Sequence, residues 1–578
     1  LLMTIEKLSK MIEVSSGKVL ADLVIRNCKV VDPISATITD GDIAIVDDYI
    51  VGVGSYNGKE VIDAKGSYAT SGLIDSHVHI ESSLCAPANF AEVVIPFGTT
   101  LIVTDPHEIA NVCGIDGIKF MIESAKKSPL KCKFMLSSCV PAVGFEDSGA
   151  VLDASVIEKF INDEDIFGLA EMMNCPGVLS LDKDVLKKLL AAINADKIID
   201  GHGVMLGGKT LNAYRAAGVY TDHECVSAKD LKARIANGMY VLLRQGSAAQ
   251  NLTSLLQGVN QSNSRRCAMC TDDKHLDHII ENGHISHNLK IAVEHGLDVF
   301  NAIAMATINA AECYRLKDIG LVAAGYKADI VLFDDLKDFK ANKVFIDGKL
   351  VSENGKSLFK VEKDNYNDNI FNTINIAPIT ANDIQIKLKS DEANVIRIVN
   401  KDLVTEKSVR IVGFENGYFK YRKSVDILKL VVLERHKATG KIGLGLIENY
   451  KLKNGAIATS VSHDSHNIIA VGDNDEDIIL AIKEIEKCSG GITVVKNGKV
   501  LDTLQLKIAG IMSDEAPNDI VKKIYSMHEL AYNELNVNRE IDPFMTLSFM
   551  ALPVIPEIKL TTSGLFDVKE FKFIDVSA

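Results

Sequence analysis

The sequence lacks several features that define large classes of protein. No apolar run approaches the roughly 18 residues that a membrane-spanning helix needs. The stretch from Leu1 to Lys10 lacks the basic start, apolar segment and cleavage site of a secretory signal. Basic residues are too few for a general nucleic-acid binder, since 63 Lys and Arg against 77 Asp and Glu leave a formal net charge of −14. We therefore expect a cytoplasmic protein that acts on small molecules and binds neither nucleic acid nor membranes.

Disulfide and phosphate-binding patterns are lacking as well. The eleven cysteines are odd in number and scattered through apolar stretches, which favours reduced thiols. Cys267 and Cys270 form a C-x-x-C pair, but no second pair or nearby His completes a zinc site, so we expect them to be strand residues. Neither G-x-x-x-x-G-K-[ST] nor G-x-G-x-x-G occurs between a strand and a helix, and we therefore expect no nucleotide-phosphate cradle.

What is present is the composition of a large globular protein. The 578 residues, 47% hydrophobic and 24% charged, predict two or three domains with large cores. Alternating apolar residues on both sides of a central segment predict short strands broken by turns. We expect residues 1–70 and 318–365 to form one small β-sandwich domain that the central segment splits. An Asn-rich linker at 366–380 precedes an expected α+β domain at 380–578.

The central segment, residues 71–317, alternates short β-rich runs with amphipathic helical stretches. Near-continuous apolar runs suit strands buried on both faces, and the alternation implies right-handed crossovers and a parallel sheet. Eight such units predict an α/β fold with a (β/α)8 barrel of the TIM type, whose active site lies at the C-terminal ends of the strands. The predicted strands are 72–80, 99–105, 131–139, 166–172, 197–203, 218–224, 239–245 and 266–272.

Ionisable residues stand at the C-terminal ends of these predicted strands. The six that we expect to converge are His77, His79, Glu171, His202, His223 and Asp272. His77 and His79 form an H-x-H, whose imidazoles project to the same side of a strand. Four imidazoles and two carboxylates suit divalent transition metals, and six ligands exceed what one open catalytic metal takes. We therefore predict a metal-dependent hydrolase with two metal ions, Glu171 as their bridge, and Asp272 as a ligand that also carries a proton.

Several stretches around these residues are distinctive. GLIDSHVHIESS (72–83) and GLVAAGYKADIVLFDDL (320–336) are of a kind common to many amidohydrolases. DPHEIANV (105–112), AGVYTDHE (217–224) and a Glu at position 171, where a bridging Lys is usual, are more particular. At these motifs the chain resembles the amidohydrolase superfamily and, within it, the adenine deaminases. The likeness covers nearly the whole chain, because that family carries a C-terminal extension of the size seen here.

The resemblance implies hydrolysis of adenine to hypoxanthine and ammonia, a reaction of purine salvage and adenine catabolism. A hydroxide from metal-activated water would attack ring atom C6 while an acid protonates ring atom N1. The expected cofactors are two divalent metal ions per chain, Mn²⁺ or Fe²⁺ or, as a third option, Zn²⁺, since His and carboxylate ligands do not select among them. The resemblance also suggests a homo-oligomer.

The acid that protonates N1 does not follow from these motifs. Better-known purine deaminases carry an acidic residue three positions beyond the His of strand five, and here that position is Met205. Glu108, Glu224 and Glu81 are the candidates, and we favour Glu108 as the catalytic acid because it lies just past strand two at the barrel mouth. The substrate-binding residues that we expect are His107, Arg244, Gln245 and Ser247.

Two other functions remain open from the sequence. A cyclic amidase of the dihydroorotase or hydantoinase type would share the barrel, although such enzymes usually have a carboxylated Lys where Glu171 stands. A catalytically inactive barrel that serves binding or assembly is expected to lose ligands, whereas all six are present. The run from His463 to His466 is predicted to be a polar loop, with capping of the barrel mouth as its alternative role.

Overall fold

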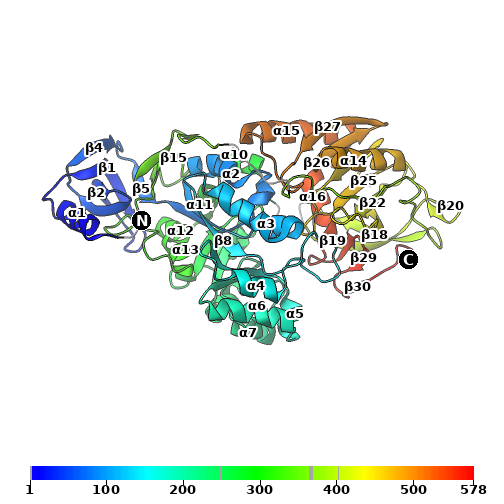
Figure 1. Cartoon of the computed structure of the whole chain (residues 1–578), viewed down its shortest axis with the longest axis horizontal. Coiled ribbons are helices and arrows are strands. Elements are labelled where there is room, and N and C mark those ends of the chain that lie inside the picture. The colour runs from blue at the N-terminus through cyan, green and yellow to red at the C-terminus, as the bar shows by residue number, and fades with distance from the viewer. Residues whose placement is uncertain (1–2, 248, 363–368, 401–402) are drawn as a thin grey trace.

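The computed structural model describes residues 3–247, 249–362, 369–400 and 403–578. Figure 1 shows three regions along the longest axis: a β-rich region with the N-terminus, a central region of strands and helices, and a C-terminal region. Among the described residues, no helix is long and apolar enough to cross a membrane. All eleven cysteines lie in the described ranges and are free. Packing and hydrogen bonds, without disulfides, hold the described regions together.

The β-rich region is one nine-stranded sheet built from both sides of the central segment. Its order is β17-β16-β15-β14-β5-β1-β2-β3, with β4 beside β1. β14 pairs antiparallel with β5, with Ile330 opposite Ser71, and apolar side chains such as Ile25 and Phe345 pack in one core. The flanking segments therefore share a sheet, as a split β domain requires, whereas its sandwich form and its limits stay predictions. The elements are α1 (Ile5–Ser15), β1 (Ala21–Asp32), β2 (Thr37–Val46), β3 (Tyr49–Gly54), β4 (Gly58–Asp63), β5 (Tyr68–Ser71), β14 (Ile330–Phe333), β15 (Ala341–Ile346), β16 (Lys349–Glu353) and β17 (Lys356–Ser357).

Eight short parallel strands run through the central region where the sequence predicts them. One curved sheet holds β6 to β10 and another holds β11 to β13. Backbone hydrogen bonds join the two sheets at both edges, from Tyr220 N to Ile199 O and from Asp272 N to His77 O, each 2.9 Å long. The parallel sheet thus curls on itself, which confirms the TIM-like architecture. These strands are β6 (Leu73–Val78), β7 (Thr99–Thr104), β8 (Lys131–Leu136), β9 (Ile166–Met172), β10 (Ile198–Gly201), β11 (Thr221–Asp222), β12 (Tyr240–Arg244) and β13 (Cys267–Cys270).

Apolar side chains fill the inside of the barrel. Ile74, Leu101 and Leu242 belong to one buried cluster, and Cys270 lies in the same cluster. Cys267 is a second fully buried residue of β13. The C-x-x-C pair therefore consists of strand residues, as predicted. Because the interior is packed, polar chemistry is left to the strand ends.

Helices separate successive strands and surround the barrel (Figure 1). α3 begins at His107, two residues after Asp105 at the end of β7, and bends at Gly114, whose φ of 59° is left-handed. The first turn of α3 therefore stands at the C-terminal end of the barrel. The helices are α2 (Pro87–Val94), α3 (His107–Ala125), α4 (Ala154–Phe160), α5 (Cys175–Leu179), α6 (Lys183–Asn194), α7 (Gly208–Ala216), α8 (Ala228–Ala236), α9 (Leu252–Leu256), α10 (Leu276–Asn282), α11 (Ile285–Glu294), α12 (Val299–Met305) and α13 (Ile308–Cys313).

The C-terminal region contains an eight-stranded sheet and a three-stranded sheet. The larger has the order β19-β18-β23-β22-β25-β24-β26-β27, and the smaller has the order β28-β29-β30. α14 packs on the larger sheet through residues such as Ile478 and Ile482, four positions apart on one helical face. The elements named from here on are β18 (Glu392–Ile398), β19 (Thr405–Ile411), β22 (Ile427–Leu433), β23 (Ile442–Glu448), β24 (Gly455–Thr459), β25 (Ile468–Gly472), α14 (Asp475–Lys487), β26 (Gly491–Lys496), β27 (Lys499–Gln505), α15 (Pro517–Glu529), α16 (Pro543–Ser548), β28 (Ile558–Thr561), β29 (Gly564–Asp567) and β30 (Lys572–Phe573).

The C-terminal region lies against the end of the barrel that carries the polar residues. Ser513 N donates to Leu84 O, in the turn after β6, at 2.8 Å. Asp147, in the loop after β8, accepts hydrogen bonds from Lys441 Nζ and Thr562 Oγ1, both at 2.7 Å. Since both loops follow the C-terminal ends of barrel strands, the C-terminal region covers part of the barrel mouth.

Candidate active site

Three of the predicted ligands meet where β6 and β13 end. The Nε2 atoms of His77 and His79 are 3.2 Å apart. Asp272 Oδ1 lies 3.4 Å from His77 Nε2 and 3.1 Å from His79 Nε2. All three side chains are buried. Period-two alternation at the end of β6 explains why both imidazoles face the same point.

The other three predicted ligands meet around Glu171, at the end of β9. Glu171 Oε2 lies 2.6 Å from His202 Nδ1 and 3.2 Å from His223 Nε2. Its other oxygen, Oε1, lies 3.5 Å from His79 Nε2. Each carboxylate oxygen of Glu171 thus faces a different set of imidazoles. This places Glu171 between the two groups of ligands.

These separations and charges fit divalent cations. Ligand atoms about 2.0–2.2 Å from one metal ion lie roughly 3–3.6 Å apart at tetrahedral or octahedral angles, and most of the measured separations fall there. Burial opposes ionisation of Glu171, but the charges of His202 and His223 outweigh it and hold the pKa of Glu171 well below its usual value. Burial likewise opposes ionisation of Asp272, but Arg244, together with His77 and His79, outweighs it, so the pKa of Asp272 is also lowered. Two ionised carboxylates among imidazoles are a donor set that divalent transition metals accept.

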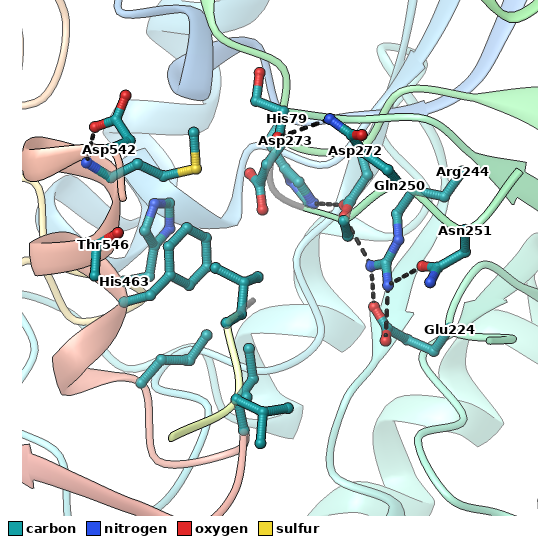
Figure 2. Close-up of a pocket in the computed structure, with 18 of the residues that line it drawn as sticks. His79, Glu224, Arg244, Gln250, Asn251, Asp272, Asp273, His463, Asp542 and Thr546 are labelled. Atoms are coloured by element: carbon teal, nitrogen blue, oxygen red, sulfur yellow. Dashed lines mark hydrogen bonds and ion pairs between the residues drawn. The ribbon is translucent and has the colours of Figure 1, made fainter. Parts of the chain in front are cut away.

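Arg244, at the end of β12, holds Asp272 from the other side. Its Nη1 donates to Asp272 Oδ2 at 2.9 Å, and its Nη2 donates to Glu224 Oε2 at 3.2 Å and to Asn251 Oδ1 at 3.1 Å. Figure 2 shows this guanidinium between the three side chains. The bond from Arg244 shows that the Glu224 side chain points into the site. This is possible because β11 ends at Asp222, so the alternation of side chains along that strand does not extend to Glu224. The fork of Arg244 fixes the orientation of Asp272.

We expect Arg244→Lys to destabilise the barrel. An ammonium cannot bond Glu224, Asn251 and Asp272 in the same planar arrangement, so a buried carboxylate loses a partner. The loss of a hydrogen bond to a charged group predicts a decrease of about 2 kcal/mol in the free energy of unfolding. Thermal or chemical denaturation measures this decrease. Arg266→Lys is the matched control. Arg266 immediately precedes β13 and stacks on the ring of Tyr240, at the start of β12, away from these carboxylates. Equal stability of the two variants would contradict the expectation.

His107 and Glu108 open α3 beside the ligand cluster. His107 Nδ1 lies 3.1 Å from Asp105 Oδ2 and 3.4 Å from Glu171 Oε1. Glu108 Oε1 lies 2.6 Å from His463 Nδ1, in the C-terminal region. The run from His463 to His466 therefore caps the barrel mouth, which is the alternative role considered for it. The sequence carries no signal for this contact, because 355 residues separate its partners.

The remaining predicted site residues are placed as follows. Ser247 Oγ accepts from His275 N and contacts His278 Nδ1, both at 2.8 Å, so its hydroxyl already has protein partners. Gln245 is buried, and its carbonyl Oε1 has no hydrogen-bond partner. Glu81 Oε1 accepts from the backbone N–H of Ile109 at 3.2 Å, and burial raises the pKa of Glu81 to about 7. Ser247 lines the central cavity, whereas Gln245 and Glu81 lie outside its wall.

One cavity of about 1010 Å³ joins the ligand cluster to the C-terminal region. Its polar wall includes His79, Arg244 and Asp272 from the barrel, and its apolar wall includes Met545 and Phe549. In Figure 2, Asp542, Thr546 and His463 of the C-terminal region lie opposite His79, Arg244 and Asp272 of the barrel. A flat heteroaromatic ring suits such a cavity, because one face of the ring meets apolar groups while its polar edge meets the carboxylates and imidazoles.

Comparisons with known proteins bear on both regions. A sequence profile described as "Amidohydrolase family" matches residues 68–351, and one described as "Adenine deaminase C-terminal domain" matches residues 402–572. An adenine deaminase of Clostridium acetobutylicum is 48% identical over 563 residues, which cover 97% of this chain and 99% of that protein. Adenine deaminase 2 of Carboxydothermus hydrogenoformans is 47% identical over 568 residues, covering 98% and 99%. An adenine deaminase of Geobacillus kaustophilus is 45% identical over 561 residues, covering 96% and 97%.

Proposed function

This chain belongs to the adenine deaminase family, and on that premise we propose that it hydrolyses adenine to hypoxanthine and ammonia. The observation that carries the proposal is identity of 45–48% over nearly the full length of such enzymes, in a chain whose six strand-end ligands converge. A cyclic amidase is disfavoured because Glu171 stands where a carboxylated Lys would be needed. An inactive barrel is disfavoured because the donor set is intact, with His202 half-buried and the other five side chains buried.

We propose that the chain holds two divalent metal ions. His77, His79 and Asp272 would bind one, His202 and His223 the other, and Glu171 would contact both. The support is that the two oxygens of Glu171 face different imidazoles. When bound, the ions would supply Lewis acidity that lowers the pKa of a water from ~15.7 toward ~7. Mn²⁺, Fe²⁺ and Zn²⁺ all accept these ligands, with Mn²⁺ or Fe²⁺ expected from the family resemblance.

The chain's own carboxyl groups account for the protons. Asp272, oriented by Arg244, would accept a proton from the attacking water and give it to the departing amino group. Glu108 would donate a proton to N1, which keeps negative charge from building up on the purine. After ammonia leaves, the proton of the new C6 hydroxyl would return to Glu108. Of the expected substrate contacts, we propose His107, Arg244 and Ser247, which line the cavity, whereas Gln245 lies outside its wall.

The wider context is also a proposal. We propose a split β domain (1–70 with 318–365), a catalytic barrel (71–317) and a C-terminal α+β domain (380–578), in a homo-oligomer. Free cysteines throughout the described chain support a reducing cytoplasmic location. Adenine is the expected small-molecule partner, and the reaction would serve purine salvage and adenine catabolism.

We expect the purified, metal-loaded protein to release ammonia and hypoxanthine from adenine in equal amounts. Removal of metal with a chelator should abolish this activity, and about two equivalents of Mn²⁺ or Fe²⁺ per chain should restore it. An ammonia assay, ultraviolet detection of hypoxanthine and metal analysis measure these outcomes. Ring opening of dihydropyrimidines without adenine turnover would favour the cyclic amidase. Metal content well below two per chain with no turnover would favour the inactive barrel.

A further inference from the structure

Glu108 is held across the junction between the barrel and the C-terminal region. Its Oε1 contacts His463 Nδ1 at 2.6 Å, and its Oε2 contacts His466 Nε2. The three residues are 2%, 5% and 1% exposed, so both contacts are shielded from bulk water. His107 Nε2, 3.4 Å from Glu108 Oε1, is the barrel's own neighbour of this carboxylate. Both oxygens of the assigned N1 donor thus depend on the C-terminal region.

His466 can act only as a hydrogen-bond donor toward Glu108. Its Nδ1 accepts the backbone N–H of Ser462 at 3.1 Å, so the proton of the neutral ring must sit on Nε2. Contacts at both nitrogens hold the ring, and the backbone carbonyl of His466 accepts a hydrogen bond from Nε of the fully buried Arg435, which anchors the loop. Burial keeps this ring neutral and lowers the pKa of His466 to about 4. Glu108 Oε2 therefore has a fixed partner with a fixed proton.

His463 differs from His466, because it can carry an additional proton. Its ring stacks on Phe549, with the ring centroids 4.3 Å apart and the planes at 16°, and it lines the cavity. Burial opposes protonation, but Glu108 outweighs burial and raises the pKa of His463 to about 9. Burial raises the pKa of Glu108 as well, but His463 and His466 outweigh it and hold that pKa well below its usual value. The proton shared by Glu108 and His463 therefore rests on the imidazole.

We propose that His463 and His466 act through Glu108 in catalysis, His463 supplying the proton that Glu108 passes to N1 and His466 fixing the other oxygen. The C-terminal domain then completes the active site in addition to covering it. This inference rests on the proposed function, since it presupposes that Glu108 protonates adenine.

The proton transfers balance over one turnover. The His463 Nδ1–H bond breaks as an O–H bond forms on Glu108, and that O–H bond breaks as N1–H forms. After ammonia leaves, the C6 hydroxyl O–H bond breaks, and its proton returns through Glu108 to His463. The pair ends each cycle with the proton that it held at the start, and no outside reactant is needed.

The test is steady-state kinetics with adenine on full-length, metal-loaded variants. His466→Phe removes the donor, and we expect kcat to fall about 10- to 100-fold with KM little changed, as for loss of a hydrogen bond to a charged group. His466→Gln places an amide N–H near Nε2 and should recover most of kcat. His463→Asn keeps a donor near Nδ1 but cannot release a proton. We therefore expect kcat to fall about 100-fold, although the hydrogen-bond donor is kept.

Controls separate this role from packing. Ser465→Ala changes the same loop, and the Ser465 hydroxyl accepts a hydrogen bond from Asn467 Nδ2 at 3.2 Å, so wild-type kcat is expected. Melting temperature and metal content of each variant check that the fold and the ligand cluster persist. If His466→Phe does not fold, His466→Gln is compared with His466→Asn, whose amide lies near Nδ1 and should not restore kcat.

The outcomes distinguish the inference from the proposed function. An active wild type with unchanged kcat in His463→Asn and His466→Phe overturns the inference and leaves the function standing. His466→Gln as slow as His466→Phe also overturns it, because the ring would then matter for its shape alone. A metal-loaded wild type that does not deaminate adenine overturns both.

Discussion

Asp272→Asn is expected to lower kcat for adenine by about 1000-fold while adenine still binds. Asp272 Oδ1 lies 3.4 Å and 3.1 Å from the Nε2 atoms of His77 and His79, and Oδ2 is fixed by Arg244. An amide has nearly the same shape, but it cannot accept a proton from water and hand it to the amino group. Removal of a positioned acid–base group costs roughly 10²–10⁴ in rate. Steady-state kcat and equilibrium binding of adenine measure the two effects separately.

The matched control for this variant is Asp329→Asn. Asp329 is also a buried aspartate, but it pairs with Lys131 Nζ at 2.7 Å at the start of β8, the opposite end of the barrel. The Asp329→Asn variant should have a lower free energy of unfolding and an unchanged kcat per folded molecule. Metal analysis of Asp272→Asn is needed as well, because loss of a ligand would lower kcat by another route. A variant with full metal content and wild-type kcat would remove Asp272 from its assigned role.

The sequence predicts the barrel and its ligand cluster because both depend on local patterns. Apolar runs of strand length identify β6 to β13, and a polar residue at a strand end has little freedom in where it points. His77 and His79 illustrate this, since two positions on one strand suffice to place both imidazoles. The six ligands come from five strands, yet a barrel brings all strand ends to one rim. The convergence therefore follows from the fold class.

Other parts of the site depend on contacts that no local pattern encodes. Gln245 follows Arg244, and its backbone N–H still donates to Cys270 O of β13 at 3.1 Å. Strand alternation therefore extends to Gln245 and turns its side chain away from the cavity that Arg244 enters. Glu224 faces the site because β11 is only two residues long and ends before it. The contacts of Glu108 with His463 and His466 arise from docking of the C-terminal region, which depends on complementary surfaces far apart in the sequence. Such contacts require the folded structure.

Glu171→Gln is expected to lower metal content from about two ions to about one per chain and to abolish adenine turnover. The amide keeps one carbonyl oxygen, whereas its NH₂ group cannot act as a ligand. The set of His77, His79 and Asp272 still offers three donors without position 171, which suffices for one ion. The set of His202 and His223 would keep two imidazoles, which is too few, so this second ion should be lost. Metal analysis after dialysis against buffer with a single metal measures the change.

Glu224→Gln is the control that makes the loss in Glu171→Gln specific. Glu224 Oε1 lies 3.5 Å from His223 Nε2 and 3.8 Å from His202 Nδ1, so it is another carboxylate near the same imidazoles. Glu224 already accepts a hydrogen bond from Arg244. We therefore do not assign it as a metal ligand, and we expect Glu224→Gln to keep both ions. Retention of two ions by Glu171→Gln would mean that Glu171 is not the bridge. Loss of one ion from Glu224→Gln instead would assign the second site to Glu224, His202 and His223, because that trio alone would then account for the ion.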